Sequence, residues 1–307
     1  MRIAVMGAGG VGGYFGARLA QSGHDVAFVA RGRHLAAMRE RGLEVRSALG
    51  DVRLLQPAVT NDPSTLAPAD IVLFAVKLWD TESAAAAVRP LVAKGGVVVP
   101  FQNGVESIER IGAFVGAEHV MGGAAYIAAT IAEPGVILHT GTMARLRFGP
   151  VLPVQQPVAD VLLAACKDAR IDAELSPDIR RAVWEKFVFL AAFSGITSVA
   201  RQSMGILRGD PDLRATLETA MREAWAVGRA KGIALADDFV AQQVKFADGL
   251  PAEMKSSMLN DLAAGNRIEA PWLCGAVARM AAEVGVPAPV NATLYASLKP
   301  YCAGALR

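Results

Sequence analysis

The stretch Met1-Arg-Ile-Ala-Val-Met-Gly-Ala-Gly-Gly-Val-Gly-Gly-Tyr-Phe-Gly16 decides the fold of this chain. It predicts a short apolar strand over residues 3–6, a glycine turn, and a helix over about residues 11–22. Gly7, Gly9 and Gly12 have the spacing G-x-G-x-x-G. In that spacing the first glycine allows the tight turn, the second lets a pyrophosphate approach the backbone, and the third lets the helix pack closely on the strand.

The amino end of the predicted helix would offer free N–H groups and the positive end of the helix dipole to an anion. The turn is therefore predicted to bind a dinucleotide, although an ordinary strand–turn–helix is the alternative. The residues predicted to contact the cofactor there are Gly7, Ala8, Gly9, Gly10, Val11 and Gly12.

The composition favours a folded protein of two domains. The chain has 307 residues, of which 53% are hydrophobic, and its net charge of +2 argues against a partner that is a nucleic acid. No uninterrupted apolar run reaches the ~20 residues that a membrane span requires, and the first strand begins without a leader. We therefore expect a cytoplasmic protein with no membrane partner. Neither the three cysteines nor the four histidines have the spacing of a metal site, so no metal is expected.

The end of the second predicted strand, residues 25–30, indicates which dinucleotide binds. A carboxylate at this point would bind the ribose 2′-hydroxyl of NAD, whereas an arginine would accommodate the 2′-phosphate of NADP. The sequence has Arg31-Gly-Arg33 and no acid. Two guanidinium groups favour a phosphate, so we predict NADPH/NADP with Arg31 as its main contact; a solvated basic loop is the alternative.

Lys77 and Asn103 follow two continuous apolar runs, residues 69–76 and 96–101. Such runs are typical of strands buried on both faces of a parallel sheet, and ligands bind beyond the carboxyl ends of such strands. Both side chains are therefore predicted to lie near the cofactor, the alternatives being an exposed loop lysine and an ordinary turn asparagine.

The rest of the chain predicts a division into residues 1–176 and residues 177–307. Short strands between residues 120 and 150, broken at Glu133-Pro-Gly135 and Thr140-Gly141, would close the sheet of the first domain. After Ser176-Pro-Asp178, which would cap the next helix, the strand signals stop. The second domain is predicted to be all-helical and to offer a possible homodimer interface.

Lys186 enters the most apolar helix of the chain, just before Phe187-Val-Phe-Leu-Ala-Ala-Phe193. A buried ammonium is unfavourable unless it has a partner or a ligand, and its pKa shifts. We therefore interpret Lys186 as a cationic proton donor, the alternative being a lysine that reaches solvent or pairs with an acid. The segment Ser256 to Glu269 predicts by itself only a capped helix.

Together these residues resemble the ketopantoate reductase (2-dehydropantoate 2-reductase) family over nearly the whole chain. The resemblance is carried by Gly7-Ala-Gly-Gly-Val-Gly12, Ala75-Val-Lys77, Gln102-Asn-Gly104, Pro134-Gly135, Trp184-Glu-Lys186, and Ser256-Ser-Met-Leu with Glu269. It implies an α/β N-terminal Rossmann-type domain and an all-α C-terminal domain like that of 6-phosphogluconate dehydrogenase, with the active site in the cleft between them. It also implies NADPH-dependent reduction of 2-dehydropantoate to (R)-pantoate, a step toward pantothenate and coenzyme A.

The resemblance also implies roles for single residues. Lys186 would be the catalytic proton donor, and Glu269 would act beside it, at the nicotinamide end of the cofactor. Asn103 would contact both cofactor and substrate, and Lys77 would help to hold either. Ala128 would offer a backbone contact to the cofactor, and Ser257 would bind the substrate.

The sequence departs from the family pattern where the substrate would be held. Family asparagines four and eight residues after the catalytic lysine are replaced by Leu190 and Ser194, and a third is replaced by Met204. We keep Ser194 among the substrate-binding residues and expect Arg201 to supply a replacement anchor for a carboxylate. The alternatives are a related reductase of another 2-oxo acid, a β-hydroxyacid dehydrogenase, and a non-catalytic sensor that binds NADPH.

Overall fold

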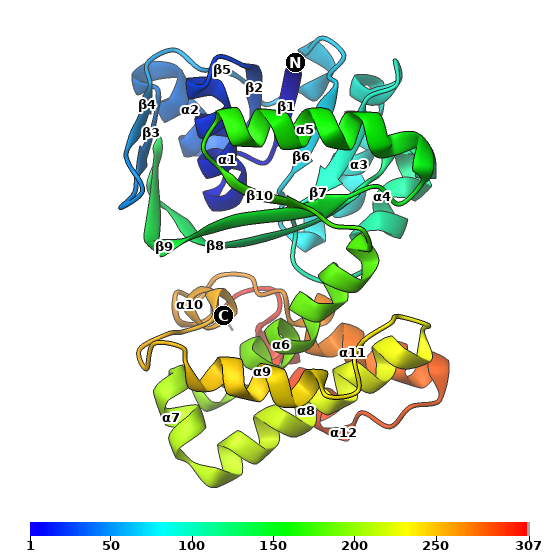
Figure 1. The fold of residues 1–307 in the computed structure, drawn as a ribbon. Coiled ribbons are helices and arrows are strands. Elements are labelled where there is room, and N and C mark those ends of the chain that lie inside the picture. Colours follow the sequence, from blue (N-terminus) through cyan, green and yellow to red (C-terminus); the bar gives the residue numbers. More distant parts are fainter. Residues whose placement is uncertain (306–307) are drawn as a thin grey trace. The chain divides into compact units, whose positions relative to one another are not determined.

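A computed structural model describes residues 1–305 of the chain (Figure 1). The chain divides into two units: Met1–Gln102 with Glu106–Ala182, and Asn103–Val105 with Val183–Arg307. The division that the sequence predicts, after residue 176, falls in the segment between strand β10 (Asp172–Leu175) and helix α6 (Ile179–Ala200).

A parallel sheet of five strands forms the centre of the first unit, in the order β5-β2-β1-β6-β7. Its strands are β1 (Arg2–Met6), β2 (Asp25–Val29), β5 (Ala58–Thr60), β6 (Ile71–Phe74) and β7 (Val97–Pro100). In β1, Ile3 and Val5 belong to the core that includes Tyr14 of α1 (Gly10–Gln21). Ala4 belongs to a separate core that includes Val88 of α3 (Thr81–Val92) and Ile111 of α4 (Ser107–Val115). Because alternate residues of a strand face opposite sides, both faces of this sheet are buried, as the apolar runs predict.

A second sheet lies in the same unit, with the order β10-β9-β3-β4 and with β8 paired to β9. Its strands are β3 (Leu43–Arg46), β4 (Val52–Leu54), β8 (Gly122–Glu133), β9 (Val136–Gly149) and β10. The expectation that the strands after residue 120 close the first sheet is therefore wrong. Among the described residues, an isolated bridge joins Val98 of β7 to Val120, and α1 contacts both sheets. Helix α5 (Gln156–Asp168) packs on β10 and β9.

The predicted break at Thr140-Gly141 is replaced by an irregularity inside β9. Ala129 pairs with His139 and Ile127 pairs with Ala144, so residues 140–143 of β9 lie opposite Ala128 alone. Gly141 has φ +78° in this interruption, a conformation that suits glycine. The glycine therefore marks a bulge in the β8–β9 ladder and does not end the strand.

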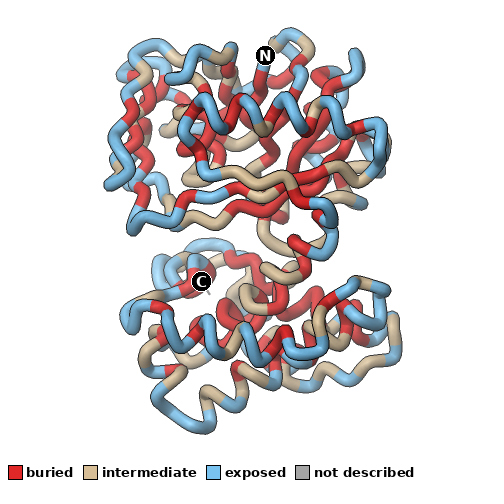
Figure 2. The backbone as a smooth tube through the Cα atoms, in the orientation of Figure 1, coloured by how far each residue is buried: buried red, intermediate tan, exposed pale blue. Residues whose placement is uncertain are grey.

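The second unit is helical, and α6 supplies much of its core. The other helices are α7 (Met204–Gly209), α8 (Pro211–Ala230), α9 (Phe239–Asp248), α10 (Ser257–Ala263), α11 (Cys274–Val284) and α12 (Pro289–Leu298). Val188, Ala191 and Ala192 of α6 are fully buried, and buried residues recur along the backbone tube of this unit (Figure 2). Helix α6 is long and apolar enough to cross a membrane, but 67% of its apolar window is buried, which is typical of a core helix.

Two carboxylates define helix ends along this part of the chain. Asp178 accepts a hydrogen bond from the backbone N of Arg181 at 3.0 Å, so it caps the start of α6 as the sequence predicts. Glu223 of α8 is buried and accepts hydrogen bonds from the backbone N atoms of Val290 and Asn291, both at 2.8 Å. A carboxylate from one helix therefore satisfies the amino end of α12, where the positive end of the helix dipole favours it.

Candidate functional site

The glycine turn after β1 has the geometry that its spacing predicts. Gly7 has φ +99°, which only glycine adopts without strain, and a Cβ on Gly12 would lie 2.2 Å from the carbonyl oxygen of Gly7. By contrast, a Cβ on Gly9 would meet no atom within 4 Å. The backbone is therefore tightly packed at Gly12 and has free space beside Gly9, which leaves room for a pyrophosphate at the amino end of α1.

Gly10 has a role that its spacing does not reveal. A Cβ at this position would lie 2.0 Å from the carbonyl oxygen of Ala129. Strand β8 therefore crosses directly over the first turn of α1, just after its bulge at Ala128. The bulge leaves Ala128 out of the β8–β9 register, at this place beside the glycine turn.

His34 of α2 (Gly32–Arg41) fixes the glycine turn from another side. Its Nδ1 accepts a hydrogen bond from the backbone N of Gly135 at 3.0 Å, so the proton of the neutral ring lies on Nε2, which donates to the carbonyl oxygen of Ala8 at 2.9 Å. Burial lowers the pKa of His34, which favours this neutral ring. The role of His34 could not be predicted from the sequence, because a lone histidine in a polar helix carries no signal of its partners.

Arg31 and Lys77 lie beyond the carboxyl ends of β2 and β6, as predicted, and both are exposed. Arg31 is the residue before α2, and its Nη2 donates to Oδ2 of Asp80 at 2.5 Å. The Nζ of Lys77 lies 5.7 Å from the centre of the Trp79 ring. Both cations therefore stand at the edge of the sheet where ligands of such folds bind.

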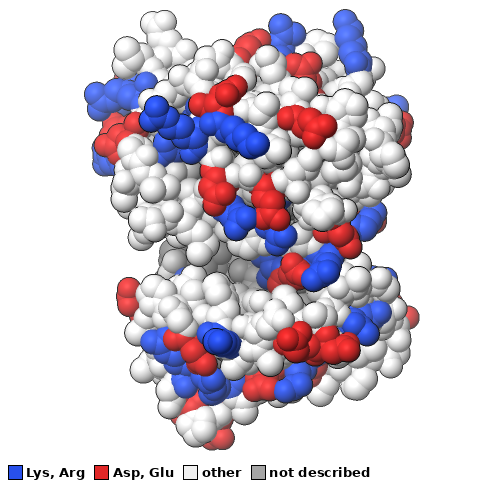
Figure 3. All heavy atoms as spheres, in the orientation of Figure 1, with Lys and Arg blue, Asp and Glu red and all other residues white. Residues whose placement is uncertain are grey.

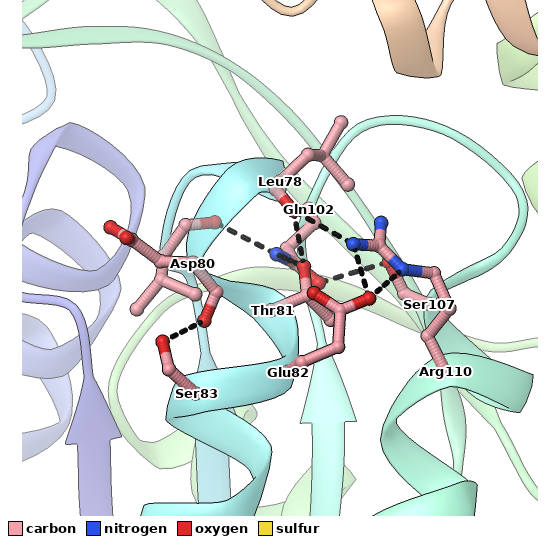
Figure 4. Close-up of polar contacts among 9 residues, drawn as sticks. Leu78, Asp80, Thr81, Glu82, Ser83, Gln102, Ser107 and Arg110 are labelled. Carbon is pink, nitrogen blue, oxygen red and sulfur yellow. Dashed lines mark hydrogen bonds and ion pairs between the residues drawn. The ribbon is translucent and has the colours of Figure 1, made fainter.

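A buried hydrogen-bond network holds the segment that follows β6 (Figure 4). Nε2 of Gln102 donates to the carbonyl oxygen of Val76 at 3.0 Å and to Oγ1 of Thr81 at 2.9 Å, while its Oε1 accepts from Oγ of Ser107 at 2.9 Å. Thr81 in turn donates to the carbonyl oxygen of Leu78 at 2.8 Å. A single amide therefore joins the ends of β6 and β7 and fixes the backbone just before Asn103.

Lys186 and Asn103 meet in the second unit. Nζ of Lys186 donates to Oδ1 of Asn103 at 3.0 Å, although the two residues are 83 positions apart in the chain. Burial lowers the pKa of Lys186 to about 8, and the nearby charge of Glu269 acts in the opposite direction. Glu269 is itself buried, with 7% of its surface exposed. These three predicted residues therefore form one cluster with a cation that can release its proton near neutral pH.

The predicted substrate residues have different surroundings. Oγ of Ser194 is buried and has no hydrogen-bond partner among the described residues, and the same holds for Ser198 one turn later. Ser257 is exposed at the start of α10, where the capping is done by Ser256, whose Oγ accepts from the backbone N of Leu259 at 3.0 Å. Arg201 is exposed just after α6 and has φ +54°. The structure thus groups Lys186, Asn103 and Glu269, whereas Ser257 and Arg201 lie at exposed positions.

Leu190 and Met204 occupy two of the positions where the family pattern has asparagine. Leu190 is half-buried, one turn of α6 after Lys186, and Met204 is fully buried in the core of the second unit. Neither side chain can hydrogen-bond as an amide does, so the position one turn of α6 after Lys186 offers a substrate no amide.

Three further features bear on what the protein can bind. Figure 3 shows both signs of charge interspersed on the visible face of each unit. Among the ion pairs of the first unit, Arg145 and Arg147 both pair with Glu174. Among residues 1–305, no group of three or more histidine, cysteine or acidic side chains could hold a metal ion. A depression lined by Arg2, Asp70 and Lys94 lies at the amino ends of β1 and β6, the opposite edge from the glycine turn.

Comparisons with known proteins agree with this arrangement. The family model described as ketopantoate reductase PanE/ApbA matches residues 3–153, and the model of its C-terminal part matches residues 178–301. The chain is 33% identical over 299 residues to the 2-dehydropantoate 2-reductase of Halobacterium salinarum, covering 96% of each chain. It is 30% identical over 301 residues to the uncharacterized oxidoreductase YkpB of Bacillus subtilis, covering 98% of this chain and 99% of that one.

Solved structures give the same result. The crystal structure of 2-dehydropantoate 2-reductase from Geobacter metallireducens GS-15 has a TM-score of 0.91 and 31% identity, covering 97% of this chain and 99% of that one. The ternary structure of D-mandelate dehydrogenase with NADH and anilino(oxo)acetate shares the fold, with a TM-score of 0.90 at 21% identity and 98% coverage of each chain. The chain therefore belongs to the ketopantoate reductase family, as an oxidoreductase that acts on CH–OH groups with a nicotinamide dinucleotide.

Proposed function

We propose that this protein reduces a 2-oxo acid to the corresponding 2-hydroxy acid with NADPH, and that the substrate is 2-dehydropantoate. The observation that carries the proposal is the hydrogen bond of 3.0 Å between Nζ of Lys186 and Oδ1 of Asn103, in the same cluster as the buried Glu269. The first unit holds the dinucleotide through residues 7–12 and the backbone at Ala128. The second unit supplies the proton donor.

Residues 7–12 and the backbone at Ala128 would hold the dinucleotide, which when bound would supply the hydride for the carbonyl carbon. Lys186 donates a proton from Nζ to the carbonyl oxygen, and its positive charge stabilises the negative charge that develops there. A lysine with a pKa of about 8 is still largely protonated at neutral pH, yet it gives up its proton more readily than an ordinary lysine. Asn103 holds the ammonium in place, and Glu269 keeps it charged until the reaction occurs.

The substrate is held in the proposal by Ser257, by Arg201 and by Ser194. The buried Oγ of Ser194 supports this role, because a buried hydroxyl without a partner is unfavourable unless a ligand or water satisfies it. A reductase of a more apolar 2-oxo acid is the second candidate, and the observation that favours it is Leu190 beside Lys186. Two alternatives, a β-hydroxyacid dehydrogenase and a sensor without catalysis, would bind the same cofactor but would not reduce 2-oxo acids.

The test is the oxidation of NADPH, followed by absorbance, with 2-dehydropantoate and a panel of aliphatic and aromatic 2-oxo acids. The highest kcat/KM for 2-dehydropantoate would support the first candidate, and a higher value for a larger apolar acid would replace it with the second. Lys186→Met, which keeps the length of the side chain without its charge, is the matched control and should abolish turnover while NADPH still binds. Binding of NADPH without turnover of any acid would contradict the proposal and favour a sensor.

The proposal also includes a cytoplasmic protein that acts as a homodimer and binds neither nucleic acid nor membrane. The net charge of +2 supports the proposal that no nucleic acid binds, and the place of α6 in a protein core supports the proposal that no membrane does. Light scattering after size exclusion tests the homodimer, because a mass near 32.1 kDa would contradict it.

A further inference from the structure

The ion pair between Arg31 and Asp80 lies at the place where the proposed site would discriminate between NADP and NAD. Nη2 of Arg31 and Oδ2 of Asp80 are 2.5 Å apart. The Arg31 side chain is 70% exposed, whereas that of Asp80 is only 25% exposed. The sequence has no acid at the end of β2. The carboxylate that pairs with Arg31 belongs to Asp80, which lies in the segment after β6.

The backbone of Asp80 is held firmly. Its N–H donates to the carbonyl oxygen of Lys77 at 2.9 Å, and its own carbonyl oxygen accepts from Oγ of Ser83 at 3.1 Å. The next residue, Thr81, is fully buried in the network around Gln102 (Figure 4). Although Asp80 is the residue before α3, its side chain makes no capping hydrogen bond and turns to Arg31 instead. The fixed partner of the pair is therefore the carboxylate, and the exposed arginine adjusts to it.

The charges of this pair act differently on the two dinucleotides. A guanidinium attracts the 2′-phosphate of NADP, which carries close to two negative charges, but a carboxylate beside it neutralises that attraction and repels the phosphate. The 2′-hydroxyl of NAD is neutral and can donate a hydrogen bond to the same carboxylate. A carboxylate next to Arg31 thus opposes the binding of one dinucleotide and not of the other.

We propose that Asp80 determines the selectivity of this protein between NADP(H) and NAD(H), by limiting the preference for the 2′-phosphate that Arg31 provides. This inference rests on the proposed dinucleotide site. It implies that the protein binds both dinucleotides with affinities closer together than an unpaired Arg31 would give. Asp80 is then a specificity-determining residue that lies outside the glycine turn and outside the strand that carries Arg31.

The test is isothermal titration of the whole protein with 2′,5′-ADP and with 5′-ADP, two fragments that differ only in the 2′-phosphate. Asp80→Asn should tighten the binding of 2′,5′-ADP roughly tenfold, as expected for removal of one partly screened like charge a few ångströms away. The binding of 5′-ADP should stay the same or weaken. The gain should shrink as the salt concentration rises, because both charges are near the surface.

Asp25→Asn is the matched control. Asp25 begins β2, at the end of the strand opposite Arg31, and pairs with Arg2 at 2.9 Å. This variant changes the net charge by the same amount and should leave both affinities unchanged. Arg31→Ala should remove the difference between the two fragments.

Two results would overturn the inference. Weaker binding of 2′,5′-ADP to Asp80→Asn would show that Asp80 instead holds Arg31 in a favourable position, and equal affinities in Asp80→Asn and wild type would show that Asp80 does not discriminate. Either result leaves the proposed function intact as long as the wild-type protein binds a fragment. If the wild-type protein binds neither fragment, the dinucleotide site itself is contradicted, and this inference with it.

Discussion

Lys186 and Asn103 are joined by a hydrogen bond of 3.0 Å, although one lies on a helix of the second unit and the other directly follows Gln102 at the end of a parallel sheet. Asn103 belongs to the second unit only because the chain enters that unit for residues 103–105 and then leaves it. The buried amide of Gln102 fixes the point from which the chain makes this excursion.

Glu269→Gln should shift the pH dependence of the reduction to lower pH. In the proposed mechanism the reduction needs Lys186 in its protonated form, so kcat/KM should fall as the pH rises through a pKa of about 8. The charge of Glu269 raises the pKa of Lys186, and its removal should lower that pKa further. A pH profile of kcat/KM measures the shift. Glu253→Gln, at an exposed position of the same unit, is the control, and a profile that moves to higher pH in Glu269→Gln would contradict the assignment.

Gly9→Ala and Gly10→Ala should have different effects although the two glycines are adjacent. A methyl group on Gly9 meets open space, so this variant should fold normally and lose at least tenfold in affinity for 5′-ADP. A methyl group on Gly10 meets the carbonyl oxygen of Ala129, so this variant should lose about 1–3 kcal/mol of stability. Urea unfolding and titration with 5′-ADP separate the two effects. Equal loss of stability in both variants would show that the turn is not open above Gly9.

His34 should make the stability of the protein depend on pH. Because burial lowers the pKa of His34 in the folded protein, the unfolded chain binds more protons as the pH falls below about 6.5. Stability should therefore decrease as the pH falls through this range, and His34→Leu should lose this part of the dependence. The midpoint of urea unfolding at a series of pH values measures it. His119→Leu serves as the histidine control, and the prediction fails if His34→Leu and wild type show the same slope.

Glu223→Ala should destabilise the second unit. The carboxylate accepts the backbone N–H groups of Val290 and Asn291, and a further hydrogen bond of 2.7 Å from Nδ2 of Asn291. Loss of these bonds leaves buried donors unsatisfied, which costs about 1–3 kcal/mol. Glu218→Ala, which removes a surface pair with Arg222 on the same helix, should cost less than about 1 kcal/mol. Thermal unfolding followed by circular dichroism compares the two, and an equal effect would contradict the role of Glu223.

The sequence predicts well those parts of the fold that local patterns specify. The helix predicted over about residues 11–22 is found at Gly10–Gln21, and Asp178 caps α6 as expected. The glycine turn is also predicted correctly, because the φ of Gly7 and the close packing at Gly12 follow from the positions of the glycines relative to the strand. The sequence also singles out Lys186 as a candidate functional residue, because a lysine in an apolar helix needs a partner or a ligand.

The contacts between distant segments could not be predicted in this way. Nothing near Gly10 in the chain indicates that Ala129 will cross over it, and nothing near Arg31 indicates that Asp80 will pair with it. Helix α2 could not be predicted from the sequence, because charged residues such as Arg39, Glu40 and Arg41 dominate it. Its apolar side is narrow and includes the buried Leu35 and Met38. The strands after residue 120 show the same limit, because their pattern predicts strands and not the sheet to which they pair.

The excursion of residues 103–105 limits how this family can be recombined. A chimera that joins residues 1–182 of this protein to the helical part of a relative would pair the new lysine with an asparagine from the old parent. A fragment that begins at residue 183 would keep Lys186 and Glu269 and lose Asn103. Exchange of one half of the gene for that of a relative therefore does not transfer the proposed catalytic cluster intact, because its asparagine and its lysine lie in different halves.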